Sequence, residues 1–370
     1  MAVKKASLNQ FEEKMKSILI VSARQFGLQK NFLEFCKMFS GKYRITYISN
    51  DLGYKKVSVD GIRTIYIRRK KGKILNRLTF LYNSLQYINN IRPAILLIGY
   101  FPLSFLLGVS GRIRNIVTII DIRSGSIRKR WRLNNYLLRV ECLFFTNISI
   151  INESLSNFLK IPKSKNYVYS VGFQKRLLTI LEKTFREYNL LYVGSLVSRQ
   201  LFLTIYAFDR FCNDHPELKL KYKIVGYGGL EDEEMIIQAI QNSRNSDKII
   251  FEGYKTSDEL FSDFQEFNIG ISFIPDNEYF QFQPPIKTYE YLAAGMPVIA
   301  TNTYENLKIL SKYNSIIIHA TEEGFYDGLE KMIEKASIFN SYKIQEPIRH
   351  FSWDVVSFKY EEFLRGKLSN

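Results

Sequence analysis

Short apolar runs alternate with amphipathic stretches along most of the chain. Residues 17–22 (SILIVS) and 95–99 (ILLIG) are almost continuously apolar, which is typical of strands buried on both faces of a parallel sheet. Leu201, Ile205 and Phe208 recur at helical spacing and indicate an amphipathic helix. The alternation of strands with helices predicts an α/β protein.

The same pattern continues through both halves of the 370 residues, which suffice for two domains with separate cores. We expect strands at 17–22, 43–49, 61–68, 95–99, 115–120, 146–151, 190–193, 221–225, 248–252, 269–273, 298–300 and 316–319. We expect helices at 30–39, 74–91, 126–141, 153–159, 201–212, 231–242, 257–267 (with Ser257 as N-cap), 286–294, 324–338 and 353–364.

Positive charge is concentrated in the first half. Residues 1–180 hold 32 Lys and Arg against 8 Asp and Glu, a net +24, whereas residues 181–370 hold 20 against 28, a net −8. This split predicts that the first half faces a polyanion, such as membrane phospholipid, nucleic acid or an anionic substrate. The alternative is a basic surface that is merely solvated.

The rest of the composition argues against metal centres, disulfides and secretion. The three cysteines and three histidines show no metal-ligand spacing, and there is no Asp-x-Asp. Residues 1–16 are charged and lack the apolar segment of a secretory signal. The apolar run at 94–109 is shorter than the ~20 residues of a membrane span. We therefore expect a cytoplasmic protein without a metal or cofactor.

Residues 284–301 (PPIKTYEYLAAGMPVIAT) combine a loop end, a helix and a short strand. A helix N-terminus offers unpaired N–H groups and a partial positive charge, which suit a phosphate. Lys287 and Glu290 lie in the first turns, where they are placed to hold a phosphate and a ribose. The alternative is an ordinary helix–turn–strand in which Gly295 caps the helix.

Within this stretch, residues 285–300 (PIKTYEYLAAGMPVIA) resemble the donor-binding signature of retaining glycosyltransferases of the GT-B fold, the large family four. The resemblance implies two facing Rossmann-like domains with a cleft between them. It places an acceptor-binding domain at 1–175, a nucleotide-sugar-binding domain at 186–350, and a last helix at 351–370 that crosses back to the first domain.

The resemblance also implies roles for single residues. Glu290 would hold the ribose of a nucleotide-sugar, and Pro285 would lie against the donor. Many members carry a second glutamate where this chain has Phe282. The glycine-rich loop usual near the start of the first domain is reduced to Gly27. At both positions the chain departs from the family pattern.

A turn at residues 194–199 (GSLVSR) is the next candidate for donor binding. In the family an arginine follows the glycine directly and, with a lysine farther on, holds the donor diphosphate. Here Ser195 follows Gly194, and Arg199 is the only nearby cation. We therefore predict that Arg199 and Lys287 share the diphosphate.

Two further turns complete the expected donor site. Gly226 and Gly228 allow the backbone to approach a ligand closely, although such glycines also serve simply as turns. Tyr254 lies in a segment that resembles the family's turn beside the nucleobase.

Asp121 and Arg123 follow the strand predicted at 115–120. Ligands of open α/β sheets bind beyond the carboxyl ends of the strands, so both residues are candidates for catalysis on the acceptor side. The alternative is a helix N-cap and a surface arginine.

The segment at 126–141 is a predicted basic helix with Trp and Leu, the composition of an interfacial membrane segment. Its candidate membrane contacts are Arg128, Lys129, Arg130, Trp131 and Arg132. The alternative is a half-buried helix with a solvated basic face, but the regional net charge favours the membrane.

The sequence thus predicts transfer of a sugar from a nucleotide-sugar, such as a UDP- or GDP-sugar, to a lipid-linked or glycan acceptor at the inner face of a membrane. The resemblance implies a retaining, metal-independent reaction in cell-surface glycan synthesis. Alternatives are a sugar-nucleotide epimerase of the same fold, although its paired carboxylates are not found, and a non-catalytic, degenerate subunit. A nucleic-acid binder is disfavoured because no such motif is present.

Overall fold

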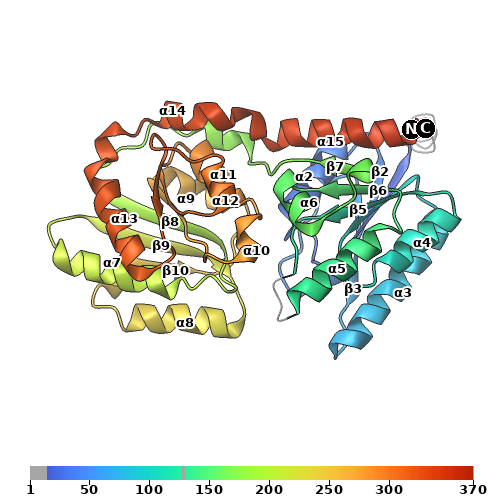
Figure 1. Cartoon of the computed structure of the whole chain (residues 1–370), viewed down its shortest axis with the longest axis horizontal. Helices are drawn as coiled ribbons and strands as arrows, with labels where there is room; N and C mark the ends of the chain where they lie inside the picture. Colours follow the sequence, from blue (N-terminus) through green and yellow to red (C-terminus); the bar gives the residue numbers. More distant parts are fainter. Residues whose placement is uncertain (1–14, 127–129, 370) are drawn as a thin grey trace, which may run out of the picture. The chain divides into compact units, whose positions relative to one another are not determined.

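The computed structural model describes residues 15–126 and 130–369, which divide into two compact units (Figure 1). Unit 1 consists of Met1–Ser170 and Trp353–Asn370, and unit 2 of Val171–Ser352. Each unit holds one parallel sheet with helices between its strands, which confirms the predicted α/β class. Among the described residues, no helix is both long and apolar enough to cross a membrane.

The sheet of unit 1 has seven strands in the order β3-β2-β1-β4-β5-β6-β7, and all neighbours are parallel. Its strands are β1 (Ser17–Ser22), β2 (Arg44–Asp51), β3 (Ile62–Arg68), β4 (Ile95–Gly99), β5 (Val117–Ile122), β6 (Asn147–Ile150) and β7 (Asn166–Val168). Its helices are α2 (Lys30–Phe39), α3 (Lys73–Ile91), α4 (Phe105–Ile113), α5 (Trp131–Cys142), α6 (Glu153–Leu159) and α15 (Trp353–Leu368), with a 3₁₀ turn at Lys163–Lys165.

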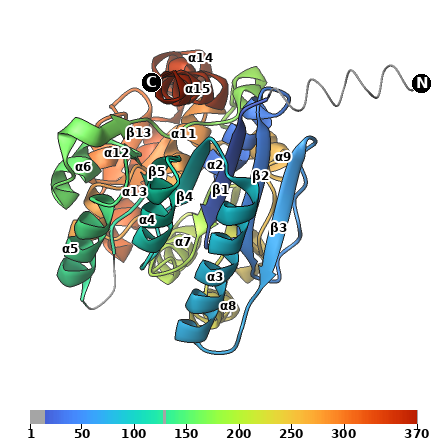
Figure 2. The same ribbon diagram turned by 90° about the vertical axis from the view of Figure 1, so that its right-hand side faces the viewer.

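Helices cover both faces of this sheet (Figure 2). α2 packs against the C-terminal helix α15, and the rings of Phe35 and Tyr360 stack 4.3 Å apart. The connection from β1 to β2 crosses the sheet in the opposite direction from those that lead through α3, α4 and α5. Because such connections are right-handed, α3, α4 and α5 lie on the other face from α2.

Unit 2 has six parallel strands in the order β10-β9-β8-β11-β12-β13. Its strands are β8 (Tyr188–Ser195), β9 (Leu220–Tyr227), β10 (Ile249–Glu252), β11 (Ile269–Ser272), β12 (Val298–Thr301) and β13 (Ser315–Ile318). Its helices are α7 (Phe202–Asp214), α8 (Leu230–Gln241), α9 (Leu260–Glu266), α10 (Glu278–Gln281), α11 (Ile286–Ala293), α12 (Tyr304–Leu307), α13 (Glu322–Glu334) and α14 (Ser341–Gln345). Its 3₁₀ turns are Lys175–Thr179, Ser246–Lys248, Ala336–Ile338 and Glu346–Phe351.

Three local predictions were wrong. β5 extends to Ile122, because its ladder with β6 continues past Asp121, so this aspartate lies inside a strand. The helix predicted from residue 126 begins at Trp131, and the Ser126 amide donates instead to a side chain, Asn135 Oδ1, at 2.7 Å.

The third correction concerns the start of α9. Ser257 does not cap this helix. The turn that precedes it is closed by Thr256, whose amide donates to Glu259 Oε2 at 2.7 Å, while Thr256 Oγ1 accepts from the Glu259 amide at 3.4 Å. This reciprocal pair is the capping-box arrangement, shifted one residue from the predicted position.

Helix α11 ends at a glycine, as the sequence predicts. The amide of Gly295 donates to Leu292 O at 3.0 Å, and that of Met296 donates to Tyr291 O at 2.9 Å, which is the Schellman pattern. Gly295 has φ +71°, and a Cβ atom at this position would lie 2.6 Å from Ser341 Cβ. Both the backbone conformation and the available space therefore require glycine.

We predict that Gly295→Ala lowers the free energy of unfolding by about 2–4 kcal/mol, because the left-handed conformation and the overlap with Ser341 each cost about 1–2 kcal/mol. Gly253→Ala is the matched control, since nothing lies within 4 Å of a Cβ atom there. Calorimetric unfolding of both variants and the wild type measures the difference. Equal stability of the two variants would contradict the requirement for glycine.

Candidate functional site

Helix α11 is held firmly on the sheet of unit 2. Tyr291 Oη accepts from the Val193 amide at 2.8 Å, and the Thr288 hydroxyl donates to Ser272 Oγ at 2.8 Å. The cap residue, Pro285, supplies no side-chain acceptor to the first turn. The partial positive charge at this helix end is therefore available to an anion.

Two cations from separate segments lie together at this end of α11. The Lys287 Nζ atom lies 3.7 Å from the centroid of the Tyr192 ring, and the Arg199 guanidinium lies 4.0 Å from that of Phe280. Burial lowers the pKa of Lys287 well below its usual range, and the positive charge of Arg199 lowers the pKa further. Like charges in such a place favour binding of an anion.

The loop that carries Arg199 has an unusual backbone. Ser198 and Gln200, on either side of Arg199, both have positive φ, at 55° and 53°, although neither is glycine. The Ser198 amide donates to Asp232 Oδ1 at 3.1 Å, and the Arg199 amide donates to Leu196 O at 3.1 Å. Such conformations persist only where the surroundings enforce them, and they concentrate at functional sites.

Glu290 lies three residues after Lys287, so the two side chains emerge on neighbouring parts of the helix surface. Only 4 % of Glu290 is exposed. The structure thus places a buried carboxylate and two adjacent cations along one short helix and the loop beside it.

The glycines of the β9 turn have a structural explanation. Gly226 lies inside β9, and a Cβ atom there would lie 2.0 Å from the carbonyl oxygen of Gly194 on β8. A Cβ atom at Gly228 would lie 3.0 Å from Asp232 Cβ on α8 and 3.1 Å from Leu196 Cβ. Close packing of the two strand ends and α8 therefore accounts for both glycines without a ligand.

The other expected donor residues lie around the same strand ends. Gly194 and Ser195 end β8, and the Tyr192 hydroxyl donates to Ser195 O at 2.7 Å. Tyr254 follows β10, and its ring lies 5.7 Å from that of Tyr227.

The sequence did not indicate the two aromatic rings that face the cations. Tyr192 lies within β8, and Phe280 lies in α10, a four-residue helix that the apolar pattern does not reveal. The two prolines before α11 indicate a structured loop, but they do not predict that Phe280 faces Arg199.

Asp121 lies in unit 1 and is 1 % exposed. Its carboxylate accepts from Ser149 Oγ at 2.7 Å, Tyr169 Oη at 3.2 Å and Asn31 Nδ2 at 3.4 Å. Burial raises its pKa, while the Arg123 guanidinium acts in the opposite direction. Asp121 is therefore part of an internal network, and the alternative of a helix N-cap is wrong.

Arg123 differs from Asp121 in its surroundings. It is half-buried, and its Nε atom has no hydrogen-bond partner within the part of the chain that the structure describes. Of these two candidates, Arg123 is thus the one with unused hydrogen-bonding capacity.

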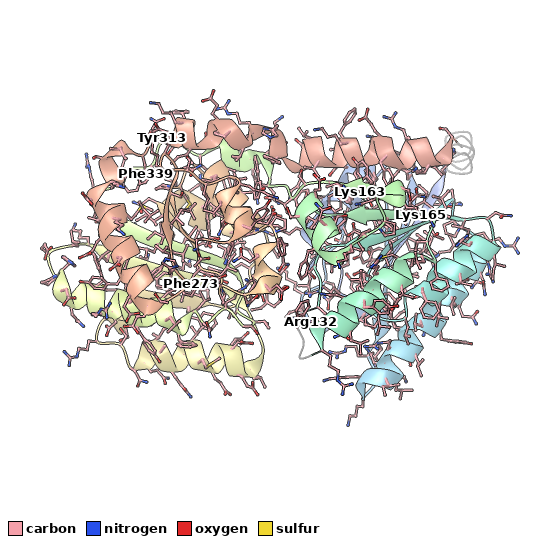
Figure 3. All side chains as sticks on the ribbon, in the orientation of Figure 1. Arg132, Lys163, Lys165, Phe273, Tyr313 and Phe339 are labelled. Carbon is pink, nitrogen blue, oxygen red and sulfur yellow. The ribbon has the colours of Figure 1, made fainter. Side chains whose placement is uncertain are left out.

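The candidate membrane residues are only partly described, because Arg128 and Lys129 lie outside the described residues. Arg130 is exposed and precedes α5. Trp131 stacks on Phe158 with ring centroids 6.0 Å apart, and the Arg132 guanidinium lies 5.2 Å from the Trp131 ring. Figure 3 marks Arg132 at the first turn of α5. Trp131 is therefore engaged by α6.

Within residues 15–126 and 130–369, no group of three or more His, Cys, Asp and Glu side chains is placed to hold a metal ion.

Comparison with solved structures gives the class of the fold. A glycosyltransferase from Rickettsia africae has a TM-score of 0.71 and 15 % identity, covering 96 % of this chain and 100 % of that one. HepE from Anabaena, solved with UDP-glucose, has a TM-score of 0.72 and 11 % identity, covering 95 % and 99 %. WaaG, a glycosyltransferase involved in lipopolysaccharide biosynthesis, has a TM-score of 0.68 and 12 % identity, covering 93 % and 98 %. The chain has the GT-B fold.

The family comparison is more specific and concerns unit 2. Residues 180–345 match the model of the family described as glycosyl transferases group 1. The resemblance to glycosyltransferases is therefore confirmed over these residues, which lie within unit 2. The sequence has no match among curated proteins.

We predict that UDP binding is accompanied by proton uptake. A bound diphosphate favours the charged form of Lys287 and raises its lowered pKa. At about pH 9, below the ordinary lysine pKa and above that of a phosphate, the wild type should take up a proton on binding. Calorimetry in buffers of different ionisation enthalpy measures this uptake.

Lys287→Met should abolish the uptake. Lys183→Met is the control, because burial lowers the pKa of Lys183 to about 8 but its ammonium donates to the Phe264 and Gln265 carbonyls at 2.6 and 2.8 Å. Uptake that survives in Lys287→Met and disappears in Lys183→Met would mean that the anion lies elsewhere.

Proposed function

We propose that the protein transfers a sugar from a nucleotide-sugar to an acceptor, with the donor held by unit 2. The observation that carries the proposal is the pair of adjacent cations, Arg199 and Lys287, at the uncapped start of α11. Two like charges held side by side repel each other, and a diphosphate bound between them would reduce that repulsion.

The same pair fits the chemistry of the reaction. When the sugar leaves, negative charge grows on the departing phosphate, and catalysis consists largely of stabilising that charge. Arg199, Lys287 and the N–H groups at the start of α11 are three fixed sources of positive potential that need no rearrangement during the reaction. The step as proposed needs no metal, and the family resemblance implies retention at the anomeric carbon.

Glu290 is proposed to accept hydrogen bonds from the ribose hydroxyls. Its burial strengthens such bonds, because water does not compete for the carboxylate. The donor is proposed to be a UDP- or GDP-sugar; the bound UDP-glucose of HepE supports a uridine nucleotide.

The acceptor is proposed to be lipid-linked or glycan and to be met by unit 1 at the cytoplasmic face of a membrane, in cell-surface glycan synthesis. The lipopolysaccharide pathway of WaaG and the net +24 of residues 1–180 support this. Arg123 is proposed to contact the acceptor. Asp121 is proposed to hold the ends of β5 and β6 in place beside the acceptor. Arg128, Lys129, Arg130 and Arg132 are proposed to add electrostatic attraction to anionic lipid.

A non-catalytic sugar-nucleotide-binding subunit is the second candidate. It is favoured by Ser195 and Phe282, which stand where related enzymes carry charged groups. This candidate retains donor binding but not turnover, so the two predictions below separate it from the enzyme.

Glu290→Gln is predicted to weaken donor binding by about 1.5–3 kcal/mol, the scale of hydrogen bonds to a charged group. Titration calorimetry with UDP-glucose and GDP-mannose measures the change. Glu361→Gln is the matched control, because Glu361 is similarly buried, at 5 % exposure, but belongs to unit 1, where it pairs with Lys42. An unchanged Kd in a folded Glu290→Gln variant would refute the ribose assignment.

Arg199→Ala and Lys287→Met are each predicted to lower kcat and kcat/KM together by roughly 10²–10³-fold, as for a lost donor to a transition-state anion. Nucleotide release during sugar transfer is the measurement. Arg210→Ala is the control, since the Arg210 guanidinium also lies over an aromatic ring, that of Tyr326, at 4.4 Å, on α7. Wild-type binding without turnover would instead support the non-catalytic subunit.

A further inference from the structure

The first part of α3 lacks the burial that its composition would normally require. This helix has nineteen residues, and its buried ones, Phe80, Leu81, Ser84 and Ile88, all lie beyond its second turn. The earlier part projects past the end of β3 (Figure 2). Large apolar side chains are exposed along it, namely Ile74 (76 % exposed), Leu75 (56 %) and Leu78 (50 %), and Tyr82 (63 %) follows one turn later.

These side chains share one face of α3. Ile74, Leu78 and Tyr82 are spaced four residues apart, and Leu75 is adjacent, so the set forms a stripe along the helix. A stripe of this kind normally packs against protein. Because unit 1 does not cover it, the stripe marks a candidate interaction surface.

Helix α5 adds a second exposed stripe to the same helical layer. Leu133 (51 % exposed), Tyr136 (60 %) and Leu137 (46 %) recur at helical spacing. Helix α4 lies between the two, because it packs on α3, and the amides of Leu103, just before α4, and of Phe105, its first residue, donate to Glu141 of α5 at 3.0 and 3.2 Å. We call the two stripes together the α3–α5 surface.

The α3–α5 surface lies at the functional edge of the sheet. α3, α4 and α5 follow β3, β4 and β5 in the chain, so each helix starts near the carboxyl end of a strand. Open α/β sheets bind ligands at that edge. Apolar side chains in the first turns of α3 and α5 therefore stand next to the place where an acceptor would enter unit 1.

The stretch of sequence that carries this surface is charged almost entirely with one sign. Residues 61–140 contain 16 Lys and Arg and a single acidic residue, Asp121, which is buried. The segment from the end of β3 to the start of α3, Arg68 to Lys73 (RRKKGK), is exposed throughout. Apolar and tyrosine side chains bordered by basic residues are the composition of a segment that lies in a lipid–water interface.

We propose that the α3–α5 surface docks on an anionic lipid bilayer, with Ile74, Leu75 and Leu78 entering the interface and the 68–73 loop contacting the headgroups. This deepens the proposed function and rests on it for the acceptor, which would be lipid-linked and presented at the same sheet edge. The apolar anchor is thus α3 and not Trp131, which is engaged by Phe158. Nucleic acid would leave the aliphatic side chains without a partner.

The test measures partition of the full chain onto vesicles of phosphatidylcholine with about 30 % phosphatidylglycerol. Ile74→Ser/Leu75→Ser/Leu78→Ser should lower the partition coefficient by at least about tenfold, since apolar burial contributes through each side chain. The control Leu230→Ser/Met235→Ser/Ile338→Ser removes three exposed apolar side chains from unit 2 and should change it less than about twofold. Lys70→Gln/Lys71→Gln/Lys73→Gln should weaken binding by about fivefold per residue and only on anionic vesicles.

Four outcomes would overturn the proposal. One is a wild type that ignores anionic vesicles at physiological salt. A second is equal loss in the control triple variant. A third is release by Arg130→Glu/Arg132→Glu while the α3 triple variant binds normally, which would place docking before α5. The fourth is a wild-type oligomer, seen by light scattering, that the α3 variant converts to a monomer.

Donor binding without vesicles keeps this proposal separate from the proposed function. Calorimetry with UDP-glucose should give the same Kd for the wild type and the α3 triple variant, because α3 belongs to unit 1. Vesicle binding without donor binding would refute the donor site alone, and the reverse would refute the α3–α5 surface alone.

Discussion

The enforced proximity of two positive charges is the constraint on which the site in unit 2 depends. In water Arg199 and Lys287 would separate, and burial makes the charged form of the lysine costly. The fold holds them together through two left-handed residues beside Arg199 and through the ring faces of Tyr192 and Phe280. The left-handed residues and the burial of Lys287 cost free energy, and the ring faces offset part of that cost. A bound anion would offset more of it, which is consistent with the proposed donor site.

The two units treat buried charge in opposite ways. In unit 1 the carboxylate of Asp121 is surrounded by donors from the protein itself, and the Tyr360 hydroxyl donates to Ser149, which extends the network to α15. In unit 2 two cations, Lys287 and Arg199, and the buried carboxylate of Glu290 lie along α11 and the loop beside it. The hydrogen bonds within unit 1 hold Asp121 in place, whereas the neighbouring cations of unit 2 are the feature on which the proposed donor site rests.

Local pattern predicted the elements but not the contacts between them. The apolar run at Ser17–Ser22 and the Gly295 stop are properties of a few adjacent residues, and both were predicted correctly. Asp121 was expected after the end of β5, but the pairing of β5 with β6 continues for two residues beyond the predicted end. The hydrogen-bond partner of Asp121, Ser149, is 28 residues away in the sequence. The Tyr192 ring that faces Lys287 belongs to β8, far from α11 in the sequence, so the spacing of residues around Lys287 could not predict this contact.

The separation of α15 from the rest of unit 1 has a consequence during synthesis on the ribosome. The whole of unit 2 must be translated before Trp353–Leu368 emerges. Until then unit 1 lacks α15, so Tyr360 does not yet cover the ring of Phe35 or donate its hydroxyl to Ser149. A nascent chain in this state exposes an aromatic face, which is the kind of surface that chaperones bind. A transcript truncated after unit 2 would leave the first unit permanently in that condition, even though it encodes every strand of the sheet.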